Sequence, residues 1–164
     1  MILAGGILLG LWIAMSMKKR VDELKQIERI INYLEGEIRY KNSLLGEACI
    51  AASLRCGQPF KLWLEKIASE LENDYAYSFS DIWEKSIEEL RDKSHLRKTD
   101  IIELVAVGQT LGYLDVKAQQ MGMALEKENI HNTIKSLESG LANNMKIAVI
   151  LGTLGGIFLV VVLA

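Results

Sequence analysis

The chain has 164 residues, of which 50% are hydrophobic and 24% are charged, with one proline and two cysteines. A net charge of −2 with both signs mixed along the chain excludes the basic stripe of a nucleic-acid-binding protein. Two cysteines exclude a disulfide framework and a four-cysteine zinc site. A single proline and few β-branched runs in the middle of the chain predict an all-α fold.

The two ends of the chain carry no charged side chain. All 19 Lys and Arg and all 21 Asp and Glu lie between Lys18 and Lys146. An uncharged helix of this length rises about 26 Å, close to the hydrocarbon core of about 30 Å but on the short side, so some local thinning or help from neighbouring helices is expected. We therefore expect an N-terminal transmembrane helix at residues 1–17, a cytoplasmic all-helical bundle at 18–146 and a C-terminal transmembrane helix at 147–164.

The positive charges beside these ends predict the orientation in the membrane. Lys18, Lys19 and Arg20 follow the first apolar stretch, whereas a cleaved signal peptide carries its positive charge before that stretch. Lys146 precedes the second one, so the positive-inside tendency places residues 18–146 in the cytoplasm. The basic triplet serves topology alone or also contacts anionic lipid headgroups.

Each predicted membrane helix contains two glycines four residues apart, Gly6 with Gly10 and Gly152 with Gly156. Such steps place small residues on one helix face and let two backbones approach closely. Either the two helices pack against each other or against partner helices, as in a homo-oligomer, or the matches arise by chance.

Periodicity predicts the helices of the first half of the bundle. The first apolar face consists of Val21, Leu24, Ile27, Ile31, Leu34 and Ile38, which are spaced by three or four residues. Ser43 is expected to cap a second helix that runs to about residue 54. Pro59 suits the start of a third helix, whose apolar face comprises Phe60, Trp63, Ile67 and Leu71.

The second half of the bundle shows clearer start signals. Ser78 and Asp81 form a capping-box pattern before a fourth helix, and residues 91–98 read as a polar loop. Thr99 with Asp100 is expected to cap a fifth helix. Gly112 ends it, and Asp115 caps a sixth. The sixth helix carries an apolar seam of Met121, Leu125, Ile130, Ile134, Leu137 and Leu141 that leads to the second membrane helix. We expect about six helices, the first and last leaving the bundle side by side.

The sequence shows no catalytic constellation. Glu128 with His131 and Asp92 with His95 have a spacing used in di-iron bundles, but such a site also needs two further Glu residues on facing helices. We therefore interpret these side chains as solvated, and Trp63 and Trp83 as core residues. No enzyme activity, metal or cofactor is predicted.

Two segments are candidates for partner contact. Arg91, Lys93, Arg97 and Lys98 make the densest basic patch, which is either a solvated turn or a docking loop for an acidic partner or lipid headgroups. The motif of Gly108, Gln109, Gly112 and Asp115 provides either close helix contact or a helix stop, and Gly112 favours the stop.

Four segments resemble one known family. LEGEIRY at residues 34–40, SLLGEA at 43–48, WEKS at 83–86 and GQTLGYLD at 108–115, the last followed by two glutamines at 119–120, are similar to the stage III sporulation protein AB family. The order of membrane helix, helical domain and membrane helix also agrees. Leu44 stands where the family often has proline, and Gln109 where glutamate is usual.

The resemblance implies a specific role. The family belongs to the channel-like assembly between mother cell and forespore in endospore-forming bacteria, and it is similar to the inner-membrane platform protein of type II secretion. The chain is then expected to be a non-catalytic platform subunit in the mother-cell membrane around the forespore. Its bundle would face the mother-cell cytoplasm, where it would contact a secretion-type ATPase and other membrane subunits of the channel. The alternative is a membrane-anchored helical sensor or adaptor.

Overall fold

A computed structural model describes residues 2–41, 44–73, 77–112 and 116–163. Its described side chains are those of residues 15–39, 44–73, 77–112, 117–141, 143 and 147. The described residues form six helices and no strand, which confirms the predicted all-α bundle. The helices are α1 (Ile2–Lys41), α2 (Leu45–Ser53), α3 (Phe60–Asn73), α4 (Phe79–Asp92), α5 (Lys98–Leu111) and α6 (Val116–Leu163).

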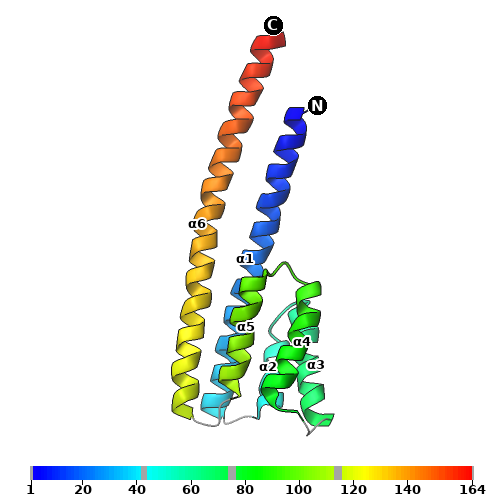
Figure 1. Cartoon of the computed structure of the whole chain (residues 1–164), viewed down its shortest axis with the longest axis vertical. Helices are drawn as coiled ribbons and strands as arrows, with labels where there is room; N and C mark the ends of the chain where they lie inside the picture. The colour runs from blue at the N-terminus through cyan, green and yellow to red at the C-terminus, as the bar shows by residue number, and fades with distance from the viewer. Residues whose placement is uncertain (1, 42–43, 74–76, 113–115, 164) are drawn as a thin grey trace.

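The six helices form a closed ring of contacts. Each helix packs against the next one along the chain, and α6 packs back against α1. α1 and α6 run antiparallel and extend past the shorter helices at the same end of the molecule (Figure 1). The prediction that the first and last helices leave the bundle side by side is therefore confirmed.

An aromatic cluster fills the space between α3 and α4. The Trp63 and Trp83 rings meet edge to face with centroids 4.6 Å apart, and Phe60 and Phe79 pack against them. Trp63 Nε1 donates a hydrogen bond to Ser86 Oγ at 2.8 Å. Both indole rings are buried. The hydrogen bond to Ser86 offsets the cost of removing the Trp63 N–H from water. Both tryptophans are core residues, as predicted.

The predicted start of α4 is confirmed, and the predicted cap of α5 is confirmed for Asp100 but wrong for Thr99. Ser78 and Asp81 form the reciprocal capping box, and the hydrogen bonds from the Ser78 hydroxyl and N–H lower the pKa of the Asp81 carboxyl. α5 begins at Lys98, and its N-cap is Arg97, two residues before the expected cap at Thr99; the Asp100 carboxylate accepts the Arg97 backbone N–H. Thr99 is exposed on the first turn and caps nothing.

The expected cap of α2 is not found at the predicted place. Ser43 lies outside the described residues, and the N-cap position belongs to Leu44, whose side chain makes no capping hydrogen bond. The polar loop is also shorter than predicted, because α4 continues to Asp92 and leaves only residues 93–97 between α4 and α5.

The buried face of α6 differs from the predicted seam. Met121 and Leu125 are 77% and 57% exposed, whereas Met123, Ile130 and Ile134 are buried. At about 100° per residue, positions two residues from Met123 point nearly opposite to it. The predicted seam contained a step of five residues after Leu125, which breaks the helical phase.

The predicted membrane helices stay predictions. Among the side chains that the structure describes, no helical stretch is both long enough and apolar enough to cross a bilayer. The backbone is helical over residues 2–14 and 148–163, but the side chains there lie outside the description, and with them the contacts of Gly6, Gly10, Gly152 and Gly156.

A pair of substitutions on α6 tests which face is buried. Ile130→Ala removes a buried side chain and is expected to lower the free energy of unfolding by about 2–4 kcal/mol. Leu125→Ala removes an exposed one and is expected to change it by less than about 0.5 kcal/mol. Unfolding followed by circular dichroism in mild detergent measures both, and equal losses would contradict this helix phase.

Candidate interaction surfaces

The two candidate contact segments lie at opposite ends of the bundle. The loop between α4 and α5 is at the end where α1 and α6 extend outward, and the α5–α6 connection is at the other end (Figure 1). Arg91 lies in the last turn of α4, Lys93 and Arg97 lie in or beside the loop, and Lys98 begins α5. All four side chains are exposed. The structure does not bring the basic loop together with the glycine motif.

A buried ion pair fixes the basic loop against α1. The Arg20 guanidinium donates two hydrogen bonds to the Asp100 carboxylate, Nε to Oδ2 and Nη2 to Oδ1, each at 2.7 Å. The exposed fractions of the two side chains are 8% and 0%. Asp100 Oδ2 also accepts the Arg97 backbone N–H at 2.8 Å. The Asp100 carboxylate therefore has two roles: it pairs with Arg20 of α1, and it caps the N-terminus of its own helix, α5.

A second contact holds the loop itself. Glu23 accepts the backbone N–H of His95 at 2.7 Å, and its other oxygen lies 2.8 Å from His95 Nδ1. Leu96 next to it is buried, so the segment is not the purely polar turn that its composition suggested. The carboxylates of Glu23 and Asp100, which come from two different helices, thus hold the same loop against α1.

Gly108 provides a close helix contact. A Cβ atom built on it would lie 2.0 Å from Trp83 Cδ1, so the indole of α4 occupies the space that a side chain would need on α5. Trp83 Nε1 donates to the carbonyl oxygen of Leu104 at 2.8 Å. Gly108 therefore lets the α4 tryptophan lie directly on the α5 backbone.

The rest of the glycine motif marks the end of α5. Gly112 occupies the C-cap position, as expected, and a Cβ atom there would lie 2.4 Å from Ser80 Oγ. Gln109 is exposed on the surface of α5. Asp115 lies outside the described residues, so its predicted capping role is not tested. Within this motif, Gln109 is the described side chain that is free to meet a partner.

The histidines belong to separate surface pairs. His95 lies in the loop beside Glu23, and His131 Nδ1 on α6 lies 3.0 Å from Glu28 Oε1 on α1. Within the described residues, no group of three or more His, Cys, Asp and Glu side chains is arranged to hold a metal ion. The Glu128–His131 and Asp92–His95 spacings therefore do not meet in one place.

The structure also shows a half-buried carboxylate that the sequence did not indicate. Glu103 on α5 accepts the Thr133 hydroxyl of α6 at 3.3 Å, and its other oxygen is buried without a partner among the described atoms. Burial, with smaller contributions from Asp100 and Glu126, raises the pKa of the Glu103 carboxyl. Neither this carboxylate nor the Arg20–Asp100 pair has a local sequence signal, because their partners come from other helices.

The fold defines an all-helical bundle whose two long terminal helices leave it in the same direction. The chain belongs to the Stage III sporulation protein AB family, since the family's sequence profile matches residues 1–164.

Two known proteins agree with that assignment. Stage III sporulation protein AB of Bacillus subtilis (strain 168) is 26% identical over 156 residues, which cover 93% of this chain and 91% of the relative. A solved structure of Stage III sporulation protein AB (SpoIIIAB) superposes with a TM-score of 0.71 at 23% identity. The match covers 76% of this chain and 97% of the solved one, and it shows a shared fold.

Gly108→Ala tests the close contact of α4 and α5. Because the new methyl group would overlap the Trp83 indole, the free energy of unfolding is expected to fall by about 1–3 kcal/mol. Gly36→Ala on α1 is the matched control, since nothing lies within 4 Å of its added Cβ. That control is expected to gain about 0.5–1 kcal/mol from helix propensity. Thermal unfolding compares the two, and a stabilised Gly108→Ala protein would contradict the contact.

Asp100→Ala tests the buried pair. It leaves the Arg20 guanidinium buried without its partner and is expected to cost about 3–5 kcal/mol. A double variant, Arg20→Met with Asp100→Leu, removes both charges and is expected to recover most of that loss. Chemical unfolding in mild detergent measures all three proteins. A double variant as unstable as Asp100→Ala would show that the charges themselves are required.

Proposed function

We propose that this chain is a non-catalytic platform subunit of the mother cell–forespore channel assembly and that it couples a cytoplasmic secretion-type ATPase to the membrane part of that assembly. Membership of the Stage III sporulation protein AB family supports a role in sporulation. The observation that carries the proposal is the arrangement of the two uncharged chain ends, which lie on two continuous helices that leave the bundle in one direction (Figure 1).

In this proposal residues 1–17 and 147–164 cross the mother-cell membrane around the forespore. The bundle then faces the mother-cell cytoplasm, as the positive charges next to both ends favour. The glycine steps at Gly6 and Gly10 and at Gly152 and Gly156 would let the two membrane helices approach each other or those of other subunits. A homo-oligomer is one form of such an assembly.

The long helices offer a direct mechanical connection. α1 and α6 are continuous helices that run from the far end of the bundle past the shorter helices (Figure 1); they pack against each other, and Ile130 and Ile134 of α6 are buried. Two ion pairs join them across the surface, Lys25–Glu138 at 2.6 Å and Lys127–Glu35 at 2.7 Å. Exposed pairs contribute little stability, so apolar packing carries most of the connection. A force on the bundle would therefore move both ends together.

The far end of the bundle is the proposed contact for the ATPase. Gln109 is exposed at the end of α5 away from the chain termini. A partner that binds there would stay clear of the membrane surface.

Co-purification tests the role. The full chain, purified from sporulating cells in mild detergent, is expected to retain the secretion-type ATPase, and Gln109→Arg is expected to reduce the retained amount at least about tenfold by placing a charge in the contact. Thr99→Arg is the matched control, because it adds the same charge to an exposed position at the other end of α5.

The outcomes separate the role from the site. Loss of the ATPase from the unmodified, folded chain would count against the platform role. Equal retention by both arginine variants would move the contact away from Gln109 and leave the role in place. Circular dichroism of each variant shows that its helices remain folded.

A further inference from the structure

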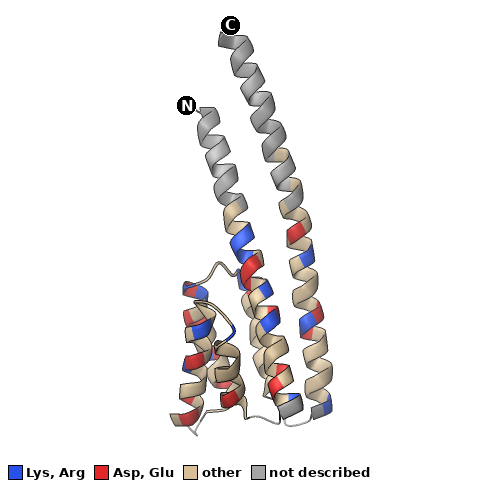
Figure 2. Cartoon of the chain, turned by 180° about the vertical axis from the view of Figure 1, so that it is seen from behind, with Lys and Arg blue, Asp and Glu red and all other residues tan. Residues whose placement is uncertain are grey.

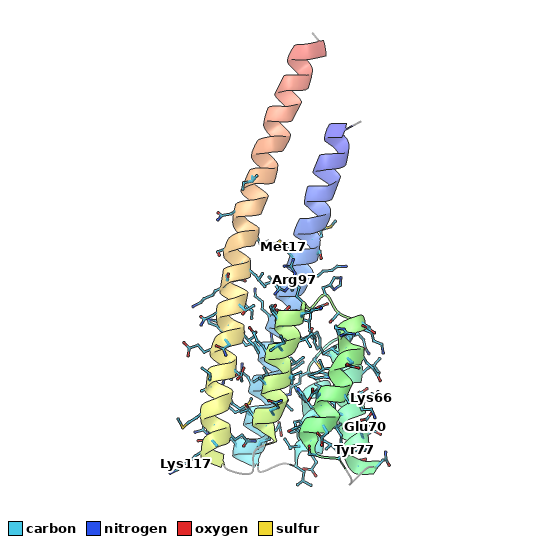
Figure 3. The ribbon with its side chains drawn as sticks, viewed as in Figure 1. Met17, Lys66, Glu70, Tyr77, Arg97 and Lys117 are labelled. Carbon is cyan, nitrogen blue, oxygen red and sulfur yellow. The ribbon has the colours of Figure 1, made fainter. Side chains whose placement is uncertain are left out.

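Four exposed cations from two segments distant in sequence lie at the same end of the bundle (Figure 1). Lys18 and Lys19 directly precede Arg20 on α1, and Arg97 and Lys98 lie at the N-terminal end of α5. The Arg20–Asp100 pair holds these segments in contact. Figure 3 shows Arg97 a little below Met17, at the end where α1 leaves the bundle. We call Lys18, Lys19, Arg97 and Lys98 the basic collar.

The acidic side chains near the collar are largely engaged. Asp100 is buried with Arg20, Glu23 is paired with His95, and Asp92 lies 3.5 Å from Arg91. Asp22 is the exposed carboxylate that remains on the adjoining turn of α1. The collar therefore keeps a net positive charge. Figure 2 shows basic residues on α1 where that helix leaves the bundle.

The position of the collar selects its partner. Lys18 directly follows the uncharged residues 1–17 on a single continuous helix. If those residues cross the membrane, the collar lies at the level of the phospholipid headgroups. Cations at that depth are attracted by the negative potential of anionic lipids. This attraction falls off within about 10 Å of the surface, the Debye length at 0.1 M salt. An acidic protein could bind these cations only by lying against the membrane surface at the level of the headgroups.

We propose that the basic collar is a docking surface for anionic phospholipid headgroups, built by Lys18 and Lys19 of α1 together with Arg97 and Lys98 of α5. This rests on the proposed membrane anchoring and adds a lipid preference to it. The sequence triplet Lys18–Arg20 is divided between two tasks. Arg20 is buried against Asp100 of α5, whereas Lys18 and Lys19 are exposed, as are Arg97 and Lys98. Binding of headgroups would fix the tilt of the bundle relative to the membrane.

Lipid selectivity measured by spin-labelled lipids tests the proposal. The full chain is reconstituted in vesicles of phosphatidylcholine with phosphatidylglycerol, and electron paramagnetic resonance compares the immobilised fraction of each spin-labelled lipid. The unmodified chain is expected to prefer phosphatidylglycerol by about threefold or more, and 0.5 M NaCl is expected to weaken that preference. The variant Lys18→Ala, Lys19→Ala, Arg97→Ala, Lys98→Ala is expected to show a ratio near one.

A matched variant removes four cations elsewhere. Its substitutions are Arg29→Ala, Lys61→Ala, Lys85→Ala and Lys135→Ala, which lie on other surfaces of the bundle. This control is expected to keep the lipid preference of the unmodified chain. Circular dichroism confirms that both variants keep their helices.

The outcomes separate the collar from the anchoring. A chain that resists carbonate extraction from vesicles but shows no preference for phosphatidylglycerol overturns the collar and leaves the membrane helices in place. A chain that carbonate extracts overturns both. If the collar variant keeps the lipid preference but loses a protein subunit of the channel on purification, the collar binds an acidic protein and the lipid proposal is wrong.

Discussion

The buried ion pair between Arg20 and Asp100 is the constraint on which the arrangement of the bundle depends. A charge with an exposed fraction below a tenth is tolerated only when its partner is held in good geometry. Here both guanidinium hydrogen bonds measure 2.7 Å, and the carboxylate also accepts the backbone N–H of Arg97, the N-cap residue of α5. Sliding α5 along α1 by one turn would separate these groups. The pair therefore fixes the register of two helices that are eighty residues apart in sequence.

Close backbone contacts fix the neighbouring spacings in the ring. Gly108 admits the Trp83 indole between α4 and α5, and Gly122 admits the Thr110 side chain between α5 and α6, where an added Cβ would lie 2.6 Å from Thr110 Cγ2. α5 is therefore bound on three sides, to α1 by charge and to α4 and α6 by glycine contacts. Because α5 is held by three other helices, the positions of both its ends are fixed relative to the rest of the bundle. One end carries the basic collar, and the other carries Gln109.

This arrangement gives the two ends of the bundle different roles in the proposed platform. The end near the chain termini combines uncharged terminal helices with exposed cations, which is the composition of a membrane-facing surface. The far end presents polar positions and helix turns without such cations in the glycine motif. The family assignment makes the bundle a sporulation component, and its helices pack in a closed ring, each against the next and the last against the first.

The sequence by itself determined which segments are helical and where most of them begin. Apolar spacing on α1 and the Ser78–Asp81 capping box depend on neighbours within one or two turns, so they can be recognised without the fold. The uncharged ends and the family resemblance were visible for the same reason. Of the candidate site, the exposure of the basic loop and the helix stop at Gly112 also followed from local composition.

Only the tertiary structure decided the pairings between helices. Arg20 looked like one more cation beside a membrane segment, because its partner Asp100 lies eighty positions away in the sequence. Thr99 looked like the cap of α5, but the helix begins before it, with Arg97 at the N-cap position. The buried face of α6 was misjudged because Met123 and Leu125 are equally apolar, and the direction in which α1 and α5 meet that helix decides which one is covered. The spacing of apolar residues along one helix does not show which other helix will pack against it. Which residues are buried depends on that packing.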